Sequence, residues 1–364
     1  MALSLHPKGQ VELGFTKLIC KIGRKMAVKK TQVPTLVDVA REAGVSLKTA
    51  SRVLNRSKNV SQEKAAKIRT VMERLGYRPN ELARGLKAKR SAAIGMIVPN
   101  LSDPFFANAV HAVQQVARTN GYVVILASSG GEVGLERSEI EGLVGRQIDG
   151  LVIAPIDSRT DTFSDIMPAG VHAVTFDQLL RNADLDSVTV TNRSSAREAT
   201  EHMVAHGLRR IVAIGARPHL YTCRERAAGY RAGMKGAGLE PRVCLVEHEN
   251  SLTSEWLAEE VFGVQKADAI FSLNWVCTML TLRGLRQLGK KAGRDIPMFS
   301  FDDFELADML TPGLSVVRQP VEMLGREAAR LLFERLGGRG GHSRGVVLPT
   351  SLIVRQSCGC EARG

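Results

Sequence analysis

The sequence predicts an N-terminal all-α helix-turn-helix domain followed by a larger α/β core of two lobes, each a parallel sheet flanked by helices. Short amphipathic helical patterns separated by a glycine fill residues 34–76. From Ala93 onward, short apolar runs alternate with amphipathic stretches, which is typical of parallel sheets covered on both faces. This second part has about 270 residues, more than a single sheet usually takes, so two lobes are expected.

Positive charge is concentrated in the first quarter of the chain. Residues 1–90 contain 21 Lys and Arg against 6 Asp and Glu, whereas the remaining residues contain 29 and 31. A basic segment attached to a nearly neutral body is the electrostatic signature of nucleic-acid binding, although a solubilising tail gives the same charge. No apolar run approaches the ~20 residues that cross a bilayer, so no membrane association is expected.

Residues 1–33 lack hydrophobic periodicity and carry seven Lys or Arg, so we expect a disordered basic extension there. Lys17 and Lys21 interrupt the apolar stretch that a signal peptide needs, and no small-residue cleavage site follows. We therefore expect a cytoplasmic protein. Met26 begins a more natural start, and our hypothesis is that translation begins there, which the intact mass of the native protein tests.

Three helical patterns predict the helix-turn-helix domain. Thr35 is positioned to cap the first helix, and Gly44 to end it with a tight turn. Ser46 and Ser61 are positioned to cap the second and third helices. Each helix has apolar residues at the spacing of one helix face. The expected inward residues are Leu36, Val39, Ala40 and Ala43, then Ala50, Val53 and Leu54, then Ala65, Ile68, Met72 and Leu75.

The second helix is the expected DNA reader. A recognition helix places its N-terminal residues against base edges in the major groove, and Arg can bind guanine through O6 and N7 together. Since the apolar residues of this helix face inward, the outward candidates for base contacts are Leu47, Lys48, Ser51 and Arg52. Candidates for phosphate contacts or caps are Ser46, Thr49, Asn55 and Ser61, with plain capping favoured for the two serines.

The core pattern is defined by strand-like and helix-like segments in alternation. The expected strands are 93–98, 122–127, 150–154, 173–176, 187–190, 210–214, 269–272, 298–301 and 314–317. The expected helices are 105–119, 194–206, 226–238, 276–288 and 321–336.

A series of motifs extends along the chain: Thr35–Asn55, Val60-Ser61, Leu75–Asn80, Leu82–Leu86, Ile94–Asn100, Asp103–Phe106, Arg226–Tyr230, Phe301–Asp303 and Leu314–Gln319. In their order and spacing, these motifs resemble those of the lactose/galactose-repressor (LacI/GalR) family. The likeness covers residues 34–355. The resemblance implies a periplasmic-binding-protein-like core, a homodimer, and a pseudo-palindromic operator in double-stranded DNA.

The resemblance implies a sequence-specific DNA-binding transcription regulator, and we expect a repressor, whose DNA affinity changes when a small molecule binds between the lobes. It also implies base contacts for Leu47, Lys48 and Arg52. The expected domains are the headpiece at 34–79, a hinge helix or linker at 80–91, an effector-binding and dimerisation core at 92–355, and a tail at 356–364. Within the core, lobe 1 is expected at about 92–190 and 318–343, and lobe 2 at about 191–317 and 344–355.

The hinge is expected to contact the minor groove through Asn80, Ala83 and Leu86. The resemblance implies that Leu86 inserts between base pairs and kinks the duplex, as apolar side chains do in other minor-groove binders. The alternative is that Leu86 packs on the core. Gly85 costs ~1 kcal/mol of helix propensity, so this hinge should be less ordered away from DNA.

Candidate effector-binding residues follow the ends of predicted strands, where ligands of parallel α/β sheets bind. Carboxylates, amides and guanidiniums there offer acceptors and donors to sugar hydroxyls. The resemblance implies contacts by Arg226, Asn274 and Asp302, and the further candidates are Asp103, Phe105, Phe106, Arg224 and Trp275.

Some of these candidates have a second interpretation. Phe105 and Phe106 fit an apolar core as well as a pocket. Arg224 beside Arg226 indicates an anionic ligand, unless it pairs with solvent or a neighbouring glutamate. Trp275 stands where the family usually has a carboxylate, so it either stacks on a sugar, closes the lobes or covers a helix start. The expected effector is a carbohydrate or a sugar phosphate.

No cofactor, metal or enzymatic activity is expected. His202 and His206 have the i, i+4 spacing of zinc ligands, but no third ligand follows at a suitable spacing. Cys358 and Cys360 could bind metal or oxidise, although two unrelated thiols on a frayed terminus are expected. The sequence has no dinucleotide-binding, phosphate-loop or nucleophile-elbow motif. The basic helix-turn-helix argues against the other alternative, a sugar-binding transport receptor.

Overall fold

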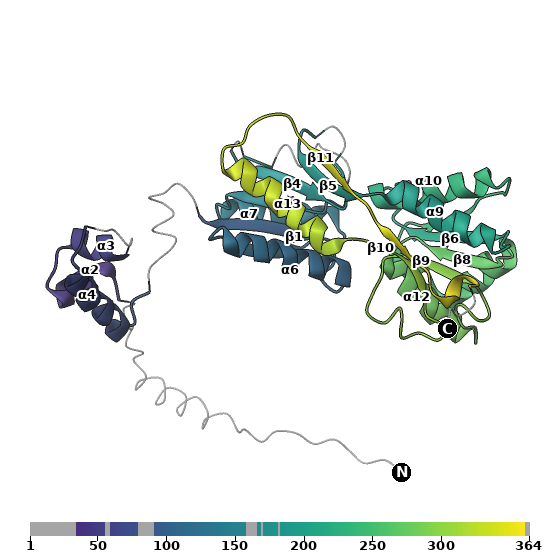
Figure 1. The fold of residues 1–364 in the computed structure, drawn as a ribbon, viewed down its shortest axis with the longest axis horizontal. Helices are drawn as coiled ribbons and strands as arrows, with labels where there is room; N and C mark the ends of the chain where they lie inside the picture. Colours follow the sequence, from purple (N-terminus) through teal and green to yellow (C-terminus); the bar gives the residue numbers. More distant parts are fainter. Residues whose placement is uncertain are drawn as a thin grey trace, which may run out of the picture. The chain divides into compact units, whose positions relative to one another are not determined.

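The computed structural model describes residues 34–54, 59–78, 91–157, 166–168, 170–180 and 183–360. The chain divides into two compact units, residues 1–83 and 84–364, which are treated separately below (Figure 1). The predicted extension, Asn55 and the hinge residues Asn80, Ala83 and Leu86 lie outside the described residues. No helix within the described ranges is long and apolar enough to span a membrane.

The first unit is the predicted helix-turn-helix, formed by α2 (Leu36–Ala43), α3 (Leu47–Leu54) and α4 (Gln62–Leu75). Thr35 and Asp38 form a reciprocal capping box at the start of α2. Gly44 ends α2 with a φ of 67°, in the left-handed region that glycine adopts without a steric penalty. The predicted caps and turn of this helix are confirmed.

The other two predicted caps differ in outcome. The backbone N–H of Thr49 donates to the hydroxyl of Ser46 at 3.2 Å, so Ser46 caps α3. Ser61 stands at the N-cap of α4, but within the described residues its side chain makes no capping hydrogen bond. The side-chain cap predicted for Ser61 is wrong. Its backbone carbonyl accepts the N–H of Ala65 at 3.0 Å, so only the main chain of Ser61 begins the helix.

The inward faces of the three helices form one small core. The predicted inward residues are buried or partly buried there, and Val71 adds to them. The buried residues of this core are Val39, Ala43, Val53, Ile68 and Val71.

Lobe 1 of the second unit has six strands among the described residues. They are β1 (Ala93–Val98), β2 (Val123–Ser128), β3 (Gly150–Ile153), β4 (His172–Phe176), β5 (Asp186–Val190) and β11 (Gly345–Leu348). Their order is β11-β5-β4-β3-β1-β2, and all neighbours are parallel. α6 (Pro104–Thr119) and α13 (Val321–Leu336) cover one face, and α7 (Val133–Gly145) covers the other.

Lobe 2 lies within the continuous described range 183–360 and also has six strands. They are β6 (Ile211–Ala216), β7 (Arg242–Val246), β8 (Ala269–Ser272), β9 (Met298–Phe301), β10 (Ser315–Arg318) and β12 (Ser351–Ile353). Their order is β12-β10-β9-β8-β6-β7, and only the β10–β12 pair is antiparallel.

Helices cover both faces of the lobe 2 sheet. α9 (Asn192–Ala205) and α10 (Tyr221–Gly236) pack on one face. α12 (Trp275–Gln287), the short α11 (Ser254–Trp256) and the π-helical η2 (Leu257–Val264) pack on the other. Two 3-10 turns, η1 (Glu249–Ser251) and η3 (Gln356–Cys358), complete the lobe. All strands and helices that the sequence predicted for the core are confirmed.

The chain passes between the lobes three times, and the last passage differs from the prediction. Residues 344–355 were expected in lobe 2, but β11 pairs with β5 in the lobe 1 sheet, from Gly345 opposite Ser187 onward. The passage therefore follows β11, and only β12 belongs to lobe 2. The predicted tail at 356–364 is also wrong in part, because η3 is held against lobe 2 and Cys358 is fully buried.

Candidate functional site

The outward face of α3 carries the predicted DNA-reading residues. Leu47 is 49% exposed, and Lys48 and Arg52 are exposed as well. Ala50 and Val53 are buried on the opposite side of the helix. The helix therefore exposes one apolar side chain and two cations to solvent, which leaves base contact by these residues a prediction.

The hydroxyl groups at the start of α3 have partners within the headpiece. The hydroxyl of Ser46 lies 2.8 Å from that of Thr49, and it also accepts the Thr49 N–H. Ser51 is partly buried in the same helix. These contacts give Ser46 and Thr49 a capping role in the isolated unit, and they leave phosphate binding by Thr49 a prediction.

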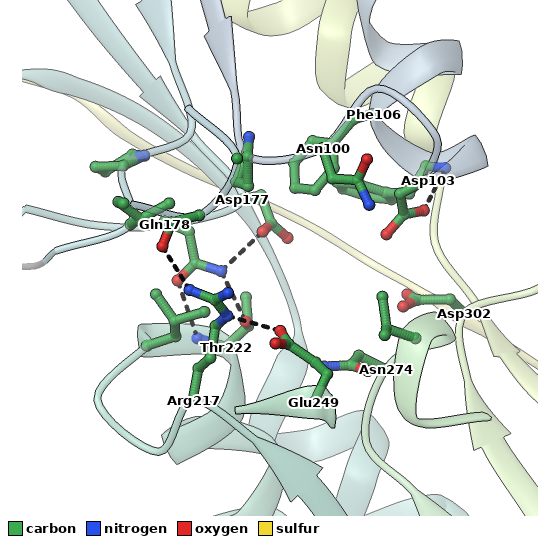
Figure 2. A pocket seen from close by; sticks show the side chains of 18 of the residues that line it. Asn100, Asp103, Phe106, Asp177, Gln178, Arg217, Thr222, Glu249, Asn274 and Asp302 are labelled. Atoms are coloured by element: carbon green, nitrogen blue, oxygen red, sulfur yellow. Dashed lines mark hydrogen bonds and ion pairs between the residues drawn. The ribbon is translucent and has the colours of Figure 1, made fainter. Parts of the chain in front are cut away.

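The second unit contains a pocket of about 570 Å³ between its lobes, at the carboxyl ends of strands from both sheets. Ligands of α/β proteins bind at this place. Figure 2 shows acidic and amide side chains from both lobes facing one another across it. The polar side chains in its lining are Asn100, Asp103, Ser128, Glu132, Asp177, Gln178, Arg217, Thr222, Arg226, His248, Glu249, Asn250, Asn274, Asp302 and Gln319.

Three buried aspartates approach the pocket from different elements. Asp103 caps the N-terminus of α6, where its Oδ1 accepts the N–H of Phe105 at 2.9 Å. Asp177 directly follows β4 and Asp302 directly follows β9. Burial, reinforced by the negative charge of Asp302, raises the pKa of Asp103 to about 7. Burial also raises the pKa of Asp177 to about 6, although Arg226 favours the ionised form.

Arg226 is the buried cation of the pocket, with a side chain that is only 4% exposed. Its Nε donates to Oδ1 of Asn192 at 2.8 Å, and a terminal nitrogen donates to the carbonyl of Leu273 at 2.8 Å. Its guanidinium carbon lies 3.7 Å from the ring centre of Phe301. The same terminal nitrogen is 3.7 Å from Oδ2 of Asp302. Arg226 is thus held firmly before any ligand binds.

Hydrogen bonds join the lobes across the pocket, and Figure 2 shows the one between Gln178 and Thr222. Nε2 of Gln178 in lobe 1 donates to the hydroxyl of Thr222 in lobe 2 at 2.8 Å. Arg217 of lobe 2 donates through NH1 to the carbonyl of Gly131 in lobe 1 at 2.6 Å. Its Nε donates to Oε1 of Glu249 at 2.6 Å. A ligand that changes either contact would also change how the lobes hold together.

Backbone strain is concentrated at this pocket. Among the described residues, six non-glycine residues have positive φ, and three of them line the pocket. These are Asp177 at 61°, Arg217 at 54° and Asp302 at 80°. Each follows a strand end, and such conformations persist where the surrounding structure holds a side chain in a functional position.

The predicted Phe pair belongs both to the core and to the pocket. Phe105 and Phe106 contact each other edge to face, with ring centres 5.0 Å apart, and Phe106 packs on Phe176 at 6.2 Å. Both rings belong to the main apolar cluster of lobe 1, and both line the pocket. They supply its apolar wall.

Asn274, Trp275 and Arg224 do not share one role. Asn274 lines the pocket while its Oδ1 caps α12 by accepting the N–H of Cys277 at 2.8 Å. Trp275 is not among the described residues lining the pocket; it lines a neighbouring groove. Arg224 is absent from the described lining too, and donates to the carbonyl of His219 at 2.5 Å. Arg224 precedes Arg226 by two positions on the same helix, which corresponds to a rotation of about 200° around the helix axis. The side chain of Arg224 therefore points away from the pocket.

Sequence reasoning missed several residues of the pocket. Asp177 directly follows the predicted strand 173–176, so the rule that found Asp302 would have found it. Arg217 directly follows β6, but β6 extends to Ala216, two residues beyond the strand predicted at 210–214, so the strand end was placed too early. Glu249 lies in a 3-10 turn and Gln178 lies two residues beyond the end of β4, where no local pattern distinguishes them from ordinary loop residues.

Comparisons with known proteins agree with this architecture. Residues 35–80 match the sequence model of bacterial regulatory proteins of the lacI family, and residues 200–358 match that of the periplasmic binding protein-like domain. The HTH-type transcriptional regulator CelR of Thermobifida fusca is 30% identical over 342 residues, which cover 91% of this chain and 100% of that protein. The ribose operon repressor of Halalkalibacterium halodurans is 28% identical over 331 residues, covering 89% and 96%.

Solved structures show the same fold. The complex of the transcriptional regulator CelR with cellobiose is 30% identical, with a TM-score of 0.66 and coverage of 89% of this chain and 99% of that one. The Lac repressor dimer bound to operator and the anti-inducer ONPF has a TM-score of 0.77 at 24% identity and the same coverage.

A helix-turn-helix headpiece joined to a periplasmic-binding-protein-like core defines a DNA-binding transcription regulator. The chain belongs to the LacI family of bacterial regulatory proteins.

Proposed function

We propose that the protein is a transcription repressor that binds a pseudo-palindromic operator as a homodimer and changes its DNA affinity when a neutral carbohydrate binds between the core lobes. The observation that carries this proposal is the pocket of about 570 Å³, which is lined by both lobes and rich in hydrogen-bonding side chains. A pocket of this size suits a small ligand.

The charge of the pocket favours a neutral polyhydroxyl ligand over a phosphorylated one. Among the described lining residues, five carboxylates face two guanidiniums. Arg217 and Arg226 are already engaged by protein acceptors. The sugar phosphate considered from the sequence depended on Arg224, which is not part of the described lining. A bound phosphate would face uncompensated carboxylates, whereas sugar hydroxyls would donate to them.

The apolar wall fits the same ligand class. The rings of Phe105 and Phe106 offer surfaces on which the C–H faces of a sugar ring can pack. Relatives add support, since CelR has been solved with cellobiose and another relative is a ribose operon repressor.

DNA recognition is assigned to α3 of each subunit. Leu47, Lys48, Ser51 and Arg52 would contact base edges, with Thr49 and Asn55 near phosphates. The hinge residues Asn80, Ala83 and Leu86 would reach the minor groove, with Leu86 as the inserted side chain. The two-fold symmetry of a homodimer would place two α3 helices on two half-sites of opposite orientation. The operator would therefore be pseudo-palindromic.

Coupling between ligand and DNA would pass through the angle between the lobes. The bonds from Gln178 to Thr222 and from Arg217 to Gly131 join the lobes at the rim of the pocket. A ligand with different affinities for two lobe arrangements would shift the balance between them. Couplings of ~1–3 kcal/mol are usual for such regulators.

The test combines a ligand screen with DNA binding. Thermal denaturation of the full chain with neutral sugars, sugar phosphates and nucleobases should give a stabilising neutral sugar. Asp302→Asn should abolish that shift, whereas Glu141→Gln, an exposed control on α7, should keep it. The same sugar should change the affinity for DNA upstream of the gene in fluorescence anisotropy, and Arg52→Ala should weaken DNA binding without altering the thermal shift.

Two results would contradict parts of the proposal. Stabilisation by sugar phosphates alone would refute the neutral ligand. Binding of a sugar with no salt-dependent DNA affinity would refute the regulator mechanism and favour a binding protein of another kind.

A further inference from the structure

Two histidines and two cysteines meet on lobe 2, although His202 and Cys358 lie 156 positions apart in the sequence. The nitrogen and sulfur atoms of His202, His206, Cys358 and Cys360 all lie within 4.8 Å of one another. The sequence-based argument against a metal was that no third ligand follows the histidine pair at a suitable spacing. It considered spacing along the chain, whereas the fold brings the C-terminal segment onto α9.

The histidines share one side of α9 near its C-terminal end. His202 lies in the last turn and His206 is the C-cap residue, so the i, i+4 spacing brings the two rings into an edge-to-face contact with centres 4.7 Å apart. The C-terminal end of a helix carries partial negative charge and favours a cation.

The cysteines are held in place by buried contacts. The hydroxyl of Ser357 donates to the carbonyl of Met298 and accepts the N–H of Ser315, each at 2.7 Å. Cys358 follows directly and is fully buried. Gly359 has a φ of 97°, which turns the chain between the two cysteines so that both sulfurs face the histidines. The cluster is therefore preorganised by the core of lobe 2.

The distances approach those of a four-coordinate metal site. Sγ of Cys360 lies 3.0 Å from Nε2 of His206 and 3.5 Å from Nε2 of His202. Sγ of Cys358 lies 3.3 Å from Nε2 of His202 and 3.3 Å from Sγ of Cys360. Tetrahedral zinc, with Zn–S of ~2.3 Å and Zn–N of ~2.0–2.1 Å, separates its ligand atoms by about 3.3–3.8 Å.

We propose that His202, His206, Cys358 and Cys360 bind one Zn²⁺ ion in a structural Cys₂His₂ site. Two thiolates and two imidazoles suit a borderline-soft ion, whereas Mg²⁺ and Ca²⁺ prefer oxygen ligands. Both thiols lose their protons to solvent when the ion binds, and four protein ligands leave no position for a substrate. The ion would tie η3 to α9, the helix whose Asn192 holds Arg226 in the pocket.

The first test measures metal in the full chain, produced without a histidine tag and kept reduced with a phosphine. Elemental analysis should find about one zinc per chain. Removal of zinc by a chelator should lower the melting temperature, and Co²⁺ should restore it with the intense ligand-field and thiolate charge-transfer bands of a tetrahedral site. Cys244→Ser, which alters a thiol outside the cluster, should behave like the natural sequence.

The second test uses the more accessible ligands, so that folding is preserved. His206 is exposed and Cys360 is partly exposed. The double variant His206→Asn/Cys360→Ser should lose more than ~100-fold in zinc affinity, beyond the ~10–100-fold typical of outer-shell changes. The proposal is overturned if the natural sequence holds no more zinc than this variant. It is equally overturned if reduced protein gives no tetrahedral Co²⁺ spectrum and the two cysteines only form a disulfide in air.

Discussion

Asp103→Asn should stabilise the ligand-free protein at alkaline pH. Asp103 is buried, and burial together with the charge of Asp302 raises its pKa to about 7. A carboxyl whose native pKa exceeds its unfolded value of ~3.9 favours folding while it is protonated, and loses that advantage as pH rises toward the native pKa. Asparagine keeps the shape and can still accept the N–H of Phe105, but it carries no charge to desolvate.

The expected size follows from the pKa difference. Each unit of pKa difference is worth ~1.36 kcal/mol, and the native protein retains the Asp103 proton that the unfolded chain releases between about pH 4 and pH 7. From pH 5 to pH 8 the free energy of unfolding of the variant should therefore gain about 2–3 kcal/mol relative to the natural sequence. At ~2–4 °C per kcal/mol, the melting temperatures should separate by about 5–10 °C.

Asp186→Asn is the matched control with the opposite sign. Burial alone would raise the pKa of Asp186, but hydrogen bonds from Arg335 and Arg344 hold this pKa well below its usual range. Ionised Asp186 stabilises the protein above the unfolded pKa of ~3.9, and this contribution is lost only as pH falls below that value. The control should thus be destabilised by ~3–5 kcal/mol, the cost of breaking a buried ion pair, and by a constant amount from pH 5 to pH 8.

The assay is thermal denaturation of the three proteins at one-unit intervals from pH 5 to pH 8 without sugar. For Asp103→Asn, the difference in melting temperature from the natural sequence should grow with pH, whereas for Asp186→Asn it should stay constant. This result would support a buried, protonated Asp103 carboxyl. Two parallel, pH-independent offsets would show that Asp103 is already ionised at pH 5 and would refute the reasoning.

Three further predictions concern packing, hydrogen bonding and DNA recognition. Gly229→Ala should lower the melting temperature by at least ~6 °C, because its Cβ would lie 2.1 Å from the backbone oxygen of Arg193, whereas Gly236→Ala, with no described atom within 4 Å, should change it little. Tyr230→Phe removes a buried hydroxyl that bonds two backbone groups and should cost ~1–3 kcal/mol in urea denaturation. Arg52→Ala should weaken specific DNA binding by ~1–3 kcal/mol, measured by anisotropy at fixed salt, with a smaller effect on unrelated DNA.

Local patterns predicted the headpiece and the regular elements of the core well. Helical spacing, capping residues and Gly44 act over a few positions, so they can be read directly from the sequence. β7 was missed because an edge strand is only half-buried and begins with Arg242. β12 and β11 were missed because each is short and lies at a sheet edge. α7 was missed because its charged residues are spread around the helix, and even Glu136 is buried.

The pocket was predicted in part, for a related reason. Asp103, Asn274 and Asp302 follow strands, and the parallel sheets bring those strand ends together. Trp275 and Arg224 were misplaced because neighbouring helix positions face different directions. The histidine–cysteine cluster depends on a contact between α9 and the segment 358–360, which no local pattern encodes.

The way the last strands are shared has a consequence for synthesis of the protein. Residues 345–353 include one edge strand for each sheet, so neither lobe is a continuous piece of chain. The headpiece is a separate unit near the start and can fold as soon as it leaves the ribosome. Neither lobe can complete its sheet until nearly the whole chain has been synthesised. A truncated protein that ends before Gly345 would expose an unpaired sheet edge in each lobe. Such edges promote aggregation and proteolysis. We therefore expect nonsense mutations late in the gene to eliminate the protein, rather than to leave a DNA-binding fragment that ignores its ligand.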